Sequence, residues 1–447
     1  MRARKLAVAS LCAAVALGAT AMDPSAHAAP DRSATAEHVS TRGSTVHLTS
    51  KTVVVSRKVA RQQLTSVSKD GGTYKFRSAV GPLGKLRAGK VLLITGLAAR
   101  DVTKVTKKRG HLTVVTTPAQ LTDVVKDGTL SLAHSIDFSK GLVAGGAAVP
   151  PERSALRRSL PERFGLQPLE HRAALTVKGK VKGYAWKAVF TPSKTGVGVE
   201  VTITRSSDVE LSVTIKGTLD DLKTGGSIAV DGGELSKASM VAKNIQGSFS
   251  LKYAAKPLNQ FGLGDAGGIK VELPAEILVP FTVGPVPFFV GVRVAFFASA
   301  GFSNFDQELS GEWTMKYDGA GGITTSSDGA TSPAGALDGL AKIILGAANA
   351  VNQGPLSFVF GAQMPQLQLG MGIKGFNVAG NVTLVGTTQI STTGPGCDTR
   401  KMRILGTTGA SASFFGLSAD LGTQNLFDKT IQAAWPTGCG TPPRSGR

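Results

Sequence analysis

The chain has 447 residues and a formal net charge of +20, from 50 Lys and Arg against 30 Asp and Glu. That length is ample for two domains or more. Aromatic residues make up only 6% of the chain, and few of them interrupt the basic stretches. This argues against a nucleic-acid partner, because single-stranded nucleic acid is bound by aromatic side chains set among basic ones.

The first 28 residues have the pattern of a secretory signal peptide. A short basic start precedes the apolar run Leu6–Ala21, and Ala26-His27-Ala28 has the form of a cleavage site. We therefore expect cleavage after Ala28 and a mature protein that is secreted or associated with the cell envelope. Residues 29–44 are polar and predict a disordered lead-in.

Residues 45–140 predict a small basic β-rich module. Short apolar runs such as Val91–Ile94 alternate with turn signals such as Arg109-Gly110. Residues 29–170 hold 23 Lys and Arg against 10 Asp and Glu, so most of the excess charge lies here. Anionic cell-wall polymer or a phospholipid surface is the expected partner. A scattered, solvated basic surface without a partner is the alternative.

Residues 141–172 predict a linker between two domains. Pro150-Pro151 breaks the chain, and Leu156, Leu160 and Phe164 then recur at the four-residue spacing of a short amphipathic helix. Pro161 interrupts this pattern, so the helix should be short or divided.

Residues 173–447 predict a large antiparallel β domain. Val199, Val201 and Ile203 alternate with polar residues, as expected for a sheet with one solvated face. Two similar segments, residues 247–253 and 311–317, suggest a locally repeated meander around the segment between them, although coincidence is the alternative. The expected body is a β-sandwich or a barrel-like sheet.

The run Ile277–Phe302 contains one charged residue, Arg293, and three prolines. Its prolines and glycines favour a β-hairpin that is apolar on both faces over a membrane helix. Three alternatives could cover the second face of this hairpin: other parts of the protein, a lipid-like ligand, or a membrane. A ligand cavity would be lined by phenylalanines, namely Phe281, Phe288, Phe296 and Phe302.

Residues 333–352 predict the one long helix of the large domain. Ser332 is a suitable N-cap, Pro333 suits the first helical position, and Gly354-Pro355 ends the segment. Leu340 and Ile344 belong to its apolar stripe. We expect this helix to pack on the β body, at a sheet edge or a barrel end.

Cleavage after Ala28 leaves two cysteines, Cys397 and Cys439. In an exported chain the simplest arrangement is one disulfide between them. The closed loop of about 42 residues suggests roughly 4 kcal/mol of stabilisation from loop-closure entropy.

The sequence offers little for catalysis. All six histidines lie within the first 171 residues, so the large domain has no base for a serine or cysteine nucleophile and no histidine for zinc. We expect no cofactor and no metal, and predict a non-catalytic binding or structural protein of a bacterial envelope. The alternatives, in order, are a carrier of a lipid-like ligand, a membrane-active protein and a carbohydrate-active enzyme, since paired carboxylates cannot be judged from sequence alone.

Overall fold

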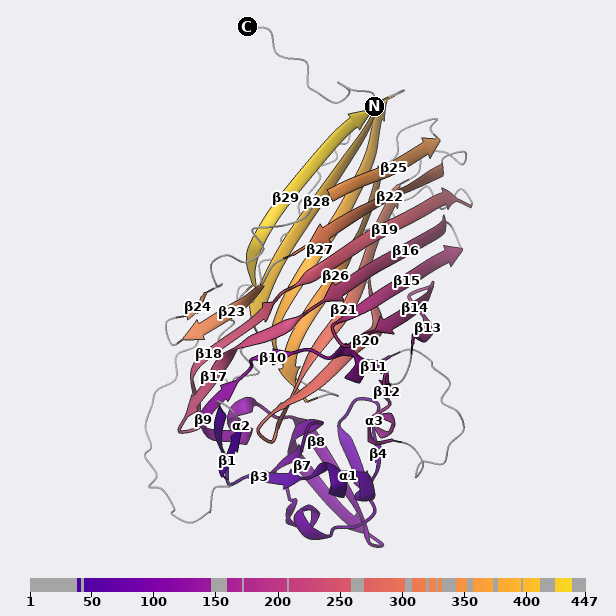
Figure 1. Ribbon diagram of the computed structural model, residues 1–447. Helices are drawn as coiled ribbons and strands as arrows, with labels where there is room; N and C mark the ends of the chain where they lie inside the picture. The colour runs from indigo at the N-terminus through magenta and orange to yellow at the C-terminus, as the bar shows by residue number, and fades with distance from the viewer. Residues whose placement is uncertain are drawn as a thin grey trace, which may run out of the picture. The chain divides into compact units, whose positions relative to one another are not determined.

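The computed structural model describes residues 38–41, 44–145, 159–170, 173–206, 209–258, 269–301, 308–318, 321–326, 329–331, 343–351, 357–372, 377–394, 397–410 and 423–435. This part of the chain is mainly β, with four sheets and a few short helices (Figure 1). The expected mainly-β architecture is therefore confirmed.

One seven-stranded antiparallel sheet, here called the front sheet, is built from strands of the large domain between residues 175 and 351. Its strands, in spatial order, are β13 (Leu175–Val181), β14 (Tyr184–Pro192), β15 (Gly196–Ser206), β16 (Val209–Asp220), β19 (Gln246–Pro257), β22 (Glu308–Tyr317) and β25 (Ile343–Val351). Buried and exposed residues alternate along β16, so one face packs inward and the other meets solvent.

An eight-stranded sheet, the back sheet, carries the hairpin that the sequence predicts. Its strands, in spatial order, are β12 (Gln167–Pro168), β11 (Leu142–Ala144), β20 (Ile269–Val283), β21 (Val286–Gly301), β26 (Ser357–Met371), β27 (Asn377–Gly394), β28 (Cys397–Ala410) and β29 (Thr423–Trp435). The hairpin β20–β21 turns at Gly284, whose φ of 60° suits glycine.

The front and back sheets pack face to face around one apolar core (Figure 1). Tyr253 of β19 stacks on Phe360 of β26 with ring centroids 4.7 Å apart. Trp313 of β22 lies so close to Gly386 of β27 that a Cβ there would come within 2.4 Å of the indole. Two antiparallel sheets with interdigitating inner faces are the arrangement of a β-sandwich.

A third sheet joins the N-terminal segment to the large domain. Its path is β1 (His38–Thr41), β2 (Ser44–Leu48), β9 (Val125–Ser131), β17 (Lys223–Asp231), β18 (Glu234–Lys243), β23 (Gly321–Ser326) and β24 (Gly329–Thr331), with β10 (His134–Ser135) also paired to β17. Strand β9 of the N-terminal segment pairs with β17 of the large domain, and β11, inside the linker expected at residues 141–172, pairs with β20.

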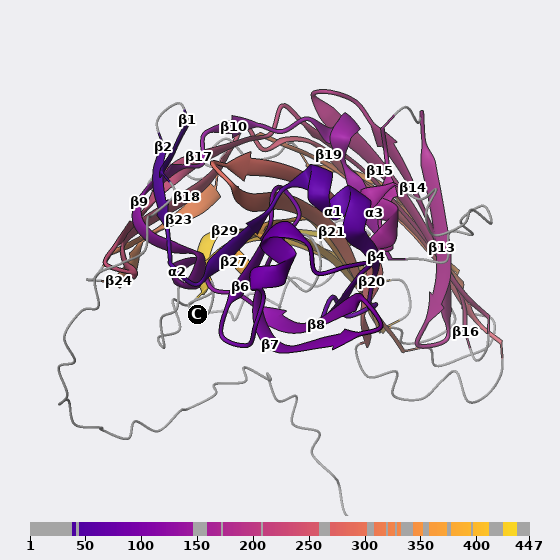
Figure 2. The ribbon, with the colours of Figure 1, turned by 90° about the horizontal axis from the view of Figure 1, so that it is seen from below.

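The fourth sheet, the module sheet, lies wholly within the N-terminal segment (Figure 2). Its strands, in spatial order, are β3 (Thr52–Val55), β6 (Val91–Ile94), β7 (Ala98–Lys108), β8 (His111–Pro118), β5 (Thr73–Phe76) and β4 (Leu64–Val67). The short helices are α1 (Arg57–Gln63), η1 (Gly81–Lys85), α2 (Leu121–Val124), η2 (Phe138–Lys140) and α3 (Leu160–Arg163).

The helix expected over residues 333–352 is wrong for its second half. Ile343–Val351 is the strand β25, paired antiparallel with β22, whereas residues 332–342 lie outside the described part. Alanine and leucine favour a helix in isolation, but β22 offers a row of backbone donors and acceptors that a strand satisfies. Tertiary pairing therefore outweighs local propensity here.

The similar segments 247–253 and 311–317 are also arranged differently from the expected meander. They lie in β19 and β22, which pair directly with each other in the front sheet. The hairpin between them in sequence belongs to the back sheet, so the chain crosses from one sheet to the other and returns.

Candidate functional site

The first face of the hairpin β20–β21 is packed into the core between the two large sheets. Phe281 and Phe288 stack with centroids 5.7 Å apart, and Phe296, eight residues further along β21, has no exposed surface. His134 stacks on Phe281 from the N-terminal segment at 5.1 Å. Phe302 lies outside the described residues. The ligand cavity expected along these rings stays a prediction, and the three described rings contact protein.

The second face of the hairpin is covered in part by the N-terminal module. Leu278 and Phe289 are fully buried in a separate apolar cluster that also holds Tyr74, Phe76 and Phe164. Tyr74 of β5 meets Phe164, just after α3, edge-on at 6.0 Å. Phe164, from the segment expected to be a linker, therefore packs in the apolar cluster between the module and the large domain.

Cys397 begins β28, and Cys439 lies outside the described residues, so the disulfide stays a prediction. Within the described ranges, no group of three or more ligand-type side chains could hold a metal ion.

A basic patch lies on the outer face of the module sheet and at the tip of the β7–β8 hairpin. All of its members are exposed: Lys75, Arg77, Lys104, Lys107, Lys108 and Arg109. Register sets Lys75 opposite Thr113, which lies opposite Thr106 of β7. Arg109 and Gly110 have φ values of 49° and 79°, as a tight two-residue hairpin turn requires. The turn that the sequence predicts here is confirmed and holds three cations at one tip.

Acidic residues do not balance this patch. Residues 51–110 contain 15 Lys and Arg but only two carboxylates, Asp70 and Asp101. On the outer face of the front sheet, by contrast, two lysines pair with glutamates: Lys216 lies 3.4 Å from Glu200, and Lys256 lies 3.0 Å from Glu210. The positive potential is therefore concentrated on the module.

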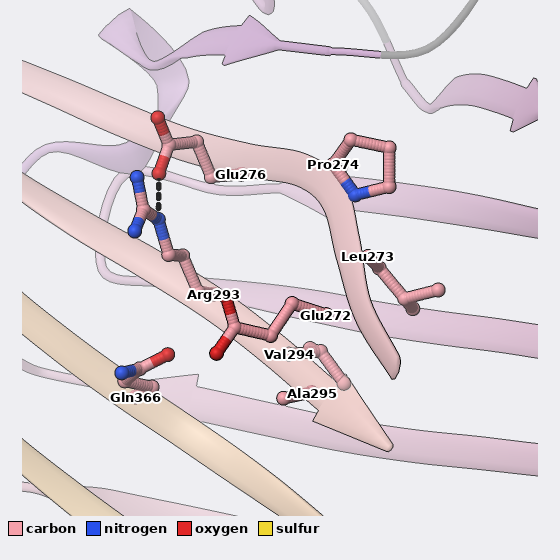
Figure 3. A pocket seen from close by; sticks show the side chains of 8 residues that line it. All are labelled: Glu272, Leu273, Pro274, Glu276, Arg293, Val294, Ala295 and Gln366. Atoms are coloured by element: carbon pink, nitrogen blue, oxygen red, sulfur yellow. Dashed lines mark hydrogen bonds and ion pairs between the residues drawn. The ribbon is translucent and has the colours of Figure 1, made fainter. Parts of the chain in front are cut away.

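A pocket of about 300 Å³ opens on the second face of the hairpin, beyond the part that the module covers (Figure 3). We call it the bulge pocket, and it is lined by Glu272, Leu273, Pro274, Glu276, Arg293, Val294, Ala295 and Gln366. Arg293 donates to Glu276, whose side chain is only 12% exposed. The pocket thus combines an ion pair, a second carboxylate and an amide with an apolar wall.

Two prolines explain why the sheet opens at this point. Pro274 of β20 and Pro365 of β26 lie on either side of β21 and have no backbone N–H to donate to the ladder. The register shifts between Glu272 and Glu276, and again between Gln363 and Gln366. Aligned β-bulges of this kind bend strands and redirect side chains.

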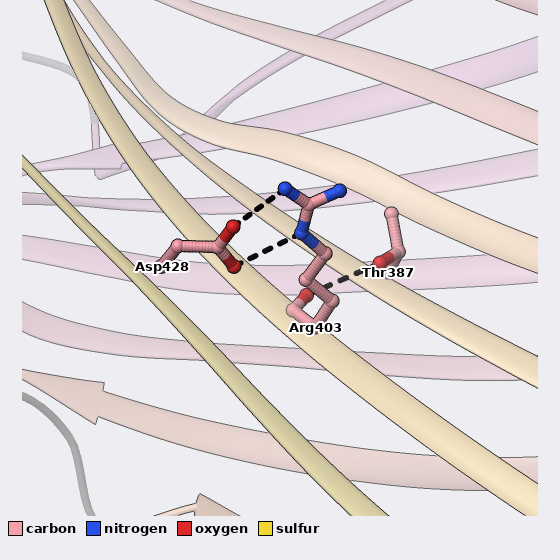
Figure 4. Close-up of polar contacts among 3 residues, drawn as sticks. All are labelled: Thr387, Arg403 and Asp428. Atoms are coloured by element: carbon pink, nitrogen blue, oxygen red, sulfur yellow. Dashed lines mark hydrogen bonds and ion pairs between the residues drawn. The ribbon is translucent and has the colours of Figure 1, made fainter. Parts of the chain in front are cut away.

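The same face of the back sheet remains polar beyond the pocket. Gln368 and Thr383 are 7% and 6% exposed, and Gln389 is exposed. Further out, Arg403 donates to both carboxylate oxygens of Asp428, at 2.9 and 2.5 Å, and Thr387 donates to the Arg403 carbonyl (Figure 4). The second face of the back sheet is therefore apolar where the module covers Leu278 and Phe289 and polar beyond that part.

The bulge pocket is absent from the expectations drawn from sequence. Two signals point to it in hindsight: Arg293 is the single charge in an apolar run, and prolines at 274 and 365 interrupt strand patterns. Neither signal gives the pairing of β20, β21 and β26, which alone brings these residues together.

Comparison with known proteins gives two family matches. A model described as a domain of unknown function (DUF8402) matches residues 167–421, more than half of the chain, and another so described (DUF8403) matches residues 36–127. No curated protein and no solved structure matches the chain. No helix within the described ranges has the length and apolar character needed to cross a membrane.

Proposed function

The chain belongs to the DUF8402 family, and from the chemistry of its surfaces we propose that it is a non-catalytic binding protein of the cell envelope. In this proposal the basic patch contacts an anionic cell-wall polymer. The observation that carries it is the concentration of exposed cations on the module: residues 51–110 contain 15 Lys and Arg, of which 13 are exposed, and only two carboxylates.

Geometry supports a polyanion rather than a single small anion. Neighbouring strands lie about 4.8 Å apart, so Lys75 on β5 and Lys104 on β7, two strands away, are separated by roughly 10 Å. This spacing is slightly longer than the Debye length of about 8 Å at physiological salt, so a ligand must contact these exposed lysines individually. A chain of phosphodiesters can contact several of them at once, which a lone phosphate cannot.

The apolar residues favour a structural role over a carrier role. Phe281, Phe288 and Phe296 are at most 8% exposed and contact other core residues. Dispersion contacts with protein already satisfy these rings, so burial of a lipid-like ligand would require the core to open.

The test is co-sedimentation with purified cell-wall sacculi. The matched samples are sacculi that keep their phosphodiester polymer and sacculi chemically stripped of it. We expect the protein to sediment with the first and stay soluble with the second. The triple variant Lys104→Gln, Lys107→Gln and Lys108→Gln should lose most of the binding, because three exposed cations are removed from one hairpin.

The control variant changes three exposed lysines on the front sheet, Lys178→Gln, Lys180→Gln and Lys187→Gln. It has the same net charge as the test variant and should bind like the wild type. Equal loss in both variants would mean that net charge alone drives binding and would overturn the assignment to the basic patch. Stronger binding to anionic phospholipid vesicles than to polymer-bearing sacculi would replace the polymer with a membrane surface.

A further inference from the structure

Three arginines lie together at the β4 edge of the module sheet, and we call them the arginine cluster. Arg61 lies in the last turn of α1, Arg77 directly follows β5, and Arg163 is the last residue of α3. Both short helices contact β4 (Figures 1 and 2). Arg61 and Arg77 are exposed, and Arg163 is partly exposed. The cluster thus combines side chains from three separate segments of the chain.

Hydrogen bonds to the backbone fix the position of the cluster. Nη1 of Arg163 donates to the carbonyl of Arg61 at 2.8 Å and to the carbonyl of Leu64. The backbone N–H of Arg77 donates to the carbonyl of Gln63 at 2.8 Å, two residues after Arg61. Arg163 therefore caps the C-terminal end of α1, where a cation is favourable.

Capping uses only part of the Arg163 guanidinium. A guanidinium has five N–H donors, and Nη1 supplies two of them to the carbonyls. Nε is buried and has no hydrogen-bond partner in the described part of the chain. Nε and Nη2 point the same way in the planar group and form a fork that can bind two oxygens of one anion. Because a buried donor without a partner is rare, this free fork favours a bound oxyanion.

No carboxylate balances the charge of the cluster. Burial lowers the pKa of Arg163, and the charges of Arg77 and Arg61 lower it further. Within the described residues no ion pair includes any of the three arginines. The neighbouring carboxylate of Glu162 accepts instead from the backbone N–H of Ser159. Like charges held together in this way repel one another, and a bound anion relieves the repulsion.

Charge and shape narrow the ligand to a phosphate dianion. A carboxylate or a phosphodiester carries one negative charge, whereas inorganic phosphate and phosphomonoesters carry about 1.5 to 2 at neutral pH. Their three terminal oxygens can accept from more than one guanidinium fork at once. The lysines of the basic patch differ in kind, because an ammonium group is a point charge on a flexible side chain and has no fork.

We propose that the arginine cluster binds a single phosphate dianion, either inorganic phosphate or the phosphomonoester of a larger molecule. Nε and Nη2 of Arg163 hold two of its oxygens, and the exposed side chains of Arg61 and Arg77 contact the third. Arg77 is shared with the basic patch, but the site uses none of the lysines. The proposal therefore stands without binding of a polymer.

The experiment is isothermal titration calorimetry of the full-length protein at pH 7.5 and constant ionic strength. The ligands are inorganic phosphate, glycerol 3-phosphate and dimethyl phosphate, which is a diester. We expect inorganic phosphate to bind at least about tenfold more tightly than dimethyl phosphate. Equal binding of glycerol 3-phosphate would assign the site to phosphomonoesters, and its failure to bind would assign the site to the free ion.

Arg61→Gln and Arg77→Gln should each weaken phosphate binding about tenfold, because each removes a charge-assisted contact. Without phosphate the same variants remove a like charge from beside Arg163, so their melting temperatures should equal or exceed that of the wild type. Saturating phosphate should raise the melting temperature of the wild type, and the variants should lose most of this rise. A purely structural role would instead lower the melting temperature with and without phosphate.

The matched control is Arg87→Gln, which changes an exposed arginine just before β6, four strands away from β4 in the module sheet. It should bind phosphate like the wild type. The triple lysine variant should do so too, which separates this test from the polymer test. The proposal is overturned if phosphate stabilises no more than chloride at equal ionic strength, if dimethyl phosphate binds as tightly, or if the cluster variants bind no more weakly than Arg87→Gln.

Discussion

Asp101 is a carboxyl group whose proton is held unusually tightly. It lies half-buried on β7, and burial, followed by the charge and hydrogen bond of Asp123, raises its pKa from 3.8 to about 6. Lys51 and Arg100 act in the opposite direction but more weakly. Asp123 is itself fixed, because it accepts from the backbone N–H of Gln120 at the start of α2.

Asp101→Asn should therefore stabilise the protein at neutral pH. The pKa of Asp101 is higher in the folded state than in the unfolded state. Protonated Asp101 therefore adds to the free energy of unfolding in full below about pH 4, and this stabilisation is lost as pH rises through about 6. Asparagine keeps the hydrogen-bond donor without the charge. After allowance for solvent screening we expect a gain of about 1–2 kcal/mol at pH 7.5 that disappears near pH 4. Urea unfolding between pH 4 and 8 measures it.

Asp70 provides a comparison of opposite sign. The Ser68 hydroxyl, and then the backbone N–H of Gly72, lower the pKa of this exposed carboxyl. Its contribution to stability is present above the unfolded-state pKa and is lost as pH falls. Asp70→Asn should therefore not stabilise the protein at pH 7.5, and a gain equal to that of Asp101→Asn would contradict the account of both residues.

At the scale of elements, the hairpin β20–β21 separates two cores. Adjacent residues of β21 point to opposite faces: Phe288 lies in the core between the large sheets, and Phe289 lies in the cluster shared with the module. Each ring is at most 1% exposed. The hairpin is thus one element that contributes to the cores of both the module and the large domain.

Phe288→Ala and Phe289→Ala should each cost about 3–5 kcal/mol but loosen different parts of the molecule. Phe289→Ala should raise amide hydrogen exchange in β4, β5 and β8, which pack on that ring's cluster. Phe288→Ala should raise exchange in β26 and β27 instead. Identical exchange maps for the two variants would show a single cooperative core and contradict this division.

Elements with a local sequence pattern could be predicted from the sequence. Elements whose structure depends on which strands pair could not. The hairpin, the Arg109-Gly110 turn and the parity of Val199, Val201 and Ile203 follow from turn residues and alternation. The strand β25 does not, since its alanines fit a helix equally well until β22 offers an edge. The bulge pocket was not predicted for the same reason, because only the strand order β20-β21-β26 places Pro274 and Pro365 on either side of Arg293.

At the scale of the whole molecule, the N-terminal segment and the large domain are joined through backbone pairing. Strand β9 pairs with β17 and β11 pairs with β20, and Leu278 and Phe289 lie in the cluster formed with the module. The sequence suggests a linker at residues 141–172 because its prolines and glycines resemble one. Its described portion instead buries Leu160 and Phe164.

The most direct measurement is the salt dependence of binding to purified phosphodiester polymer, for the wild type and for the two triple lysine variants. Each cation in contact with a polyanion releases counterions, so the logarithm of affinity falls linearly with the logarithm of salt concentration. We predict that the slope for Lys104→Gln, Lys107→Gln and Lys108→Gln is shallower than that of the wild type by about 2–3. The front-sheet variant should keep the wild-type slope, and equal slopes for all three proteins would contradict the basic patch as the polymer-binding surface.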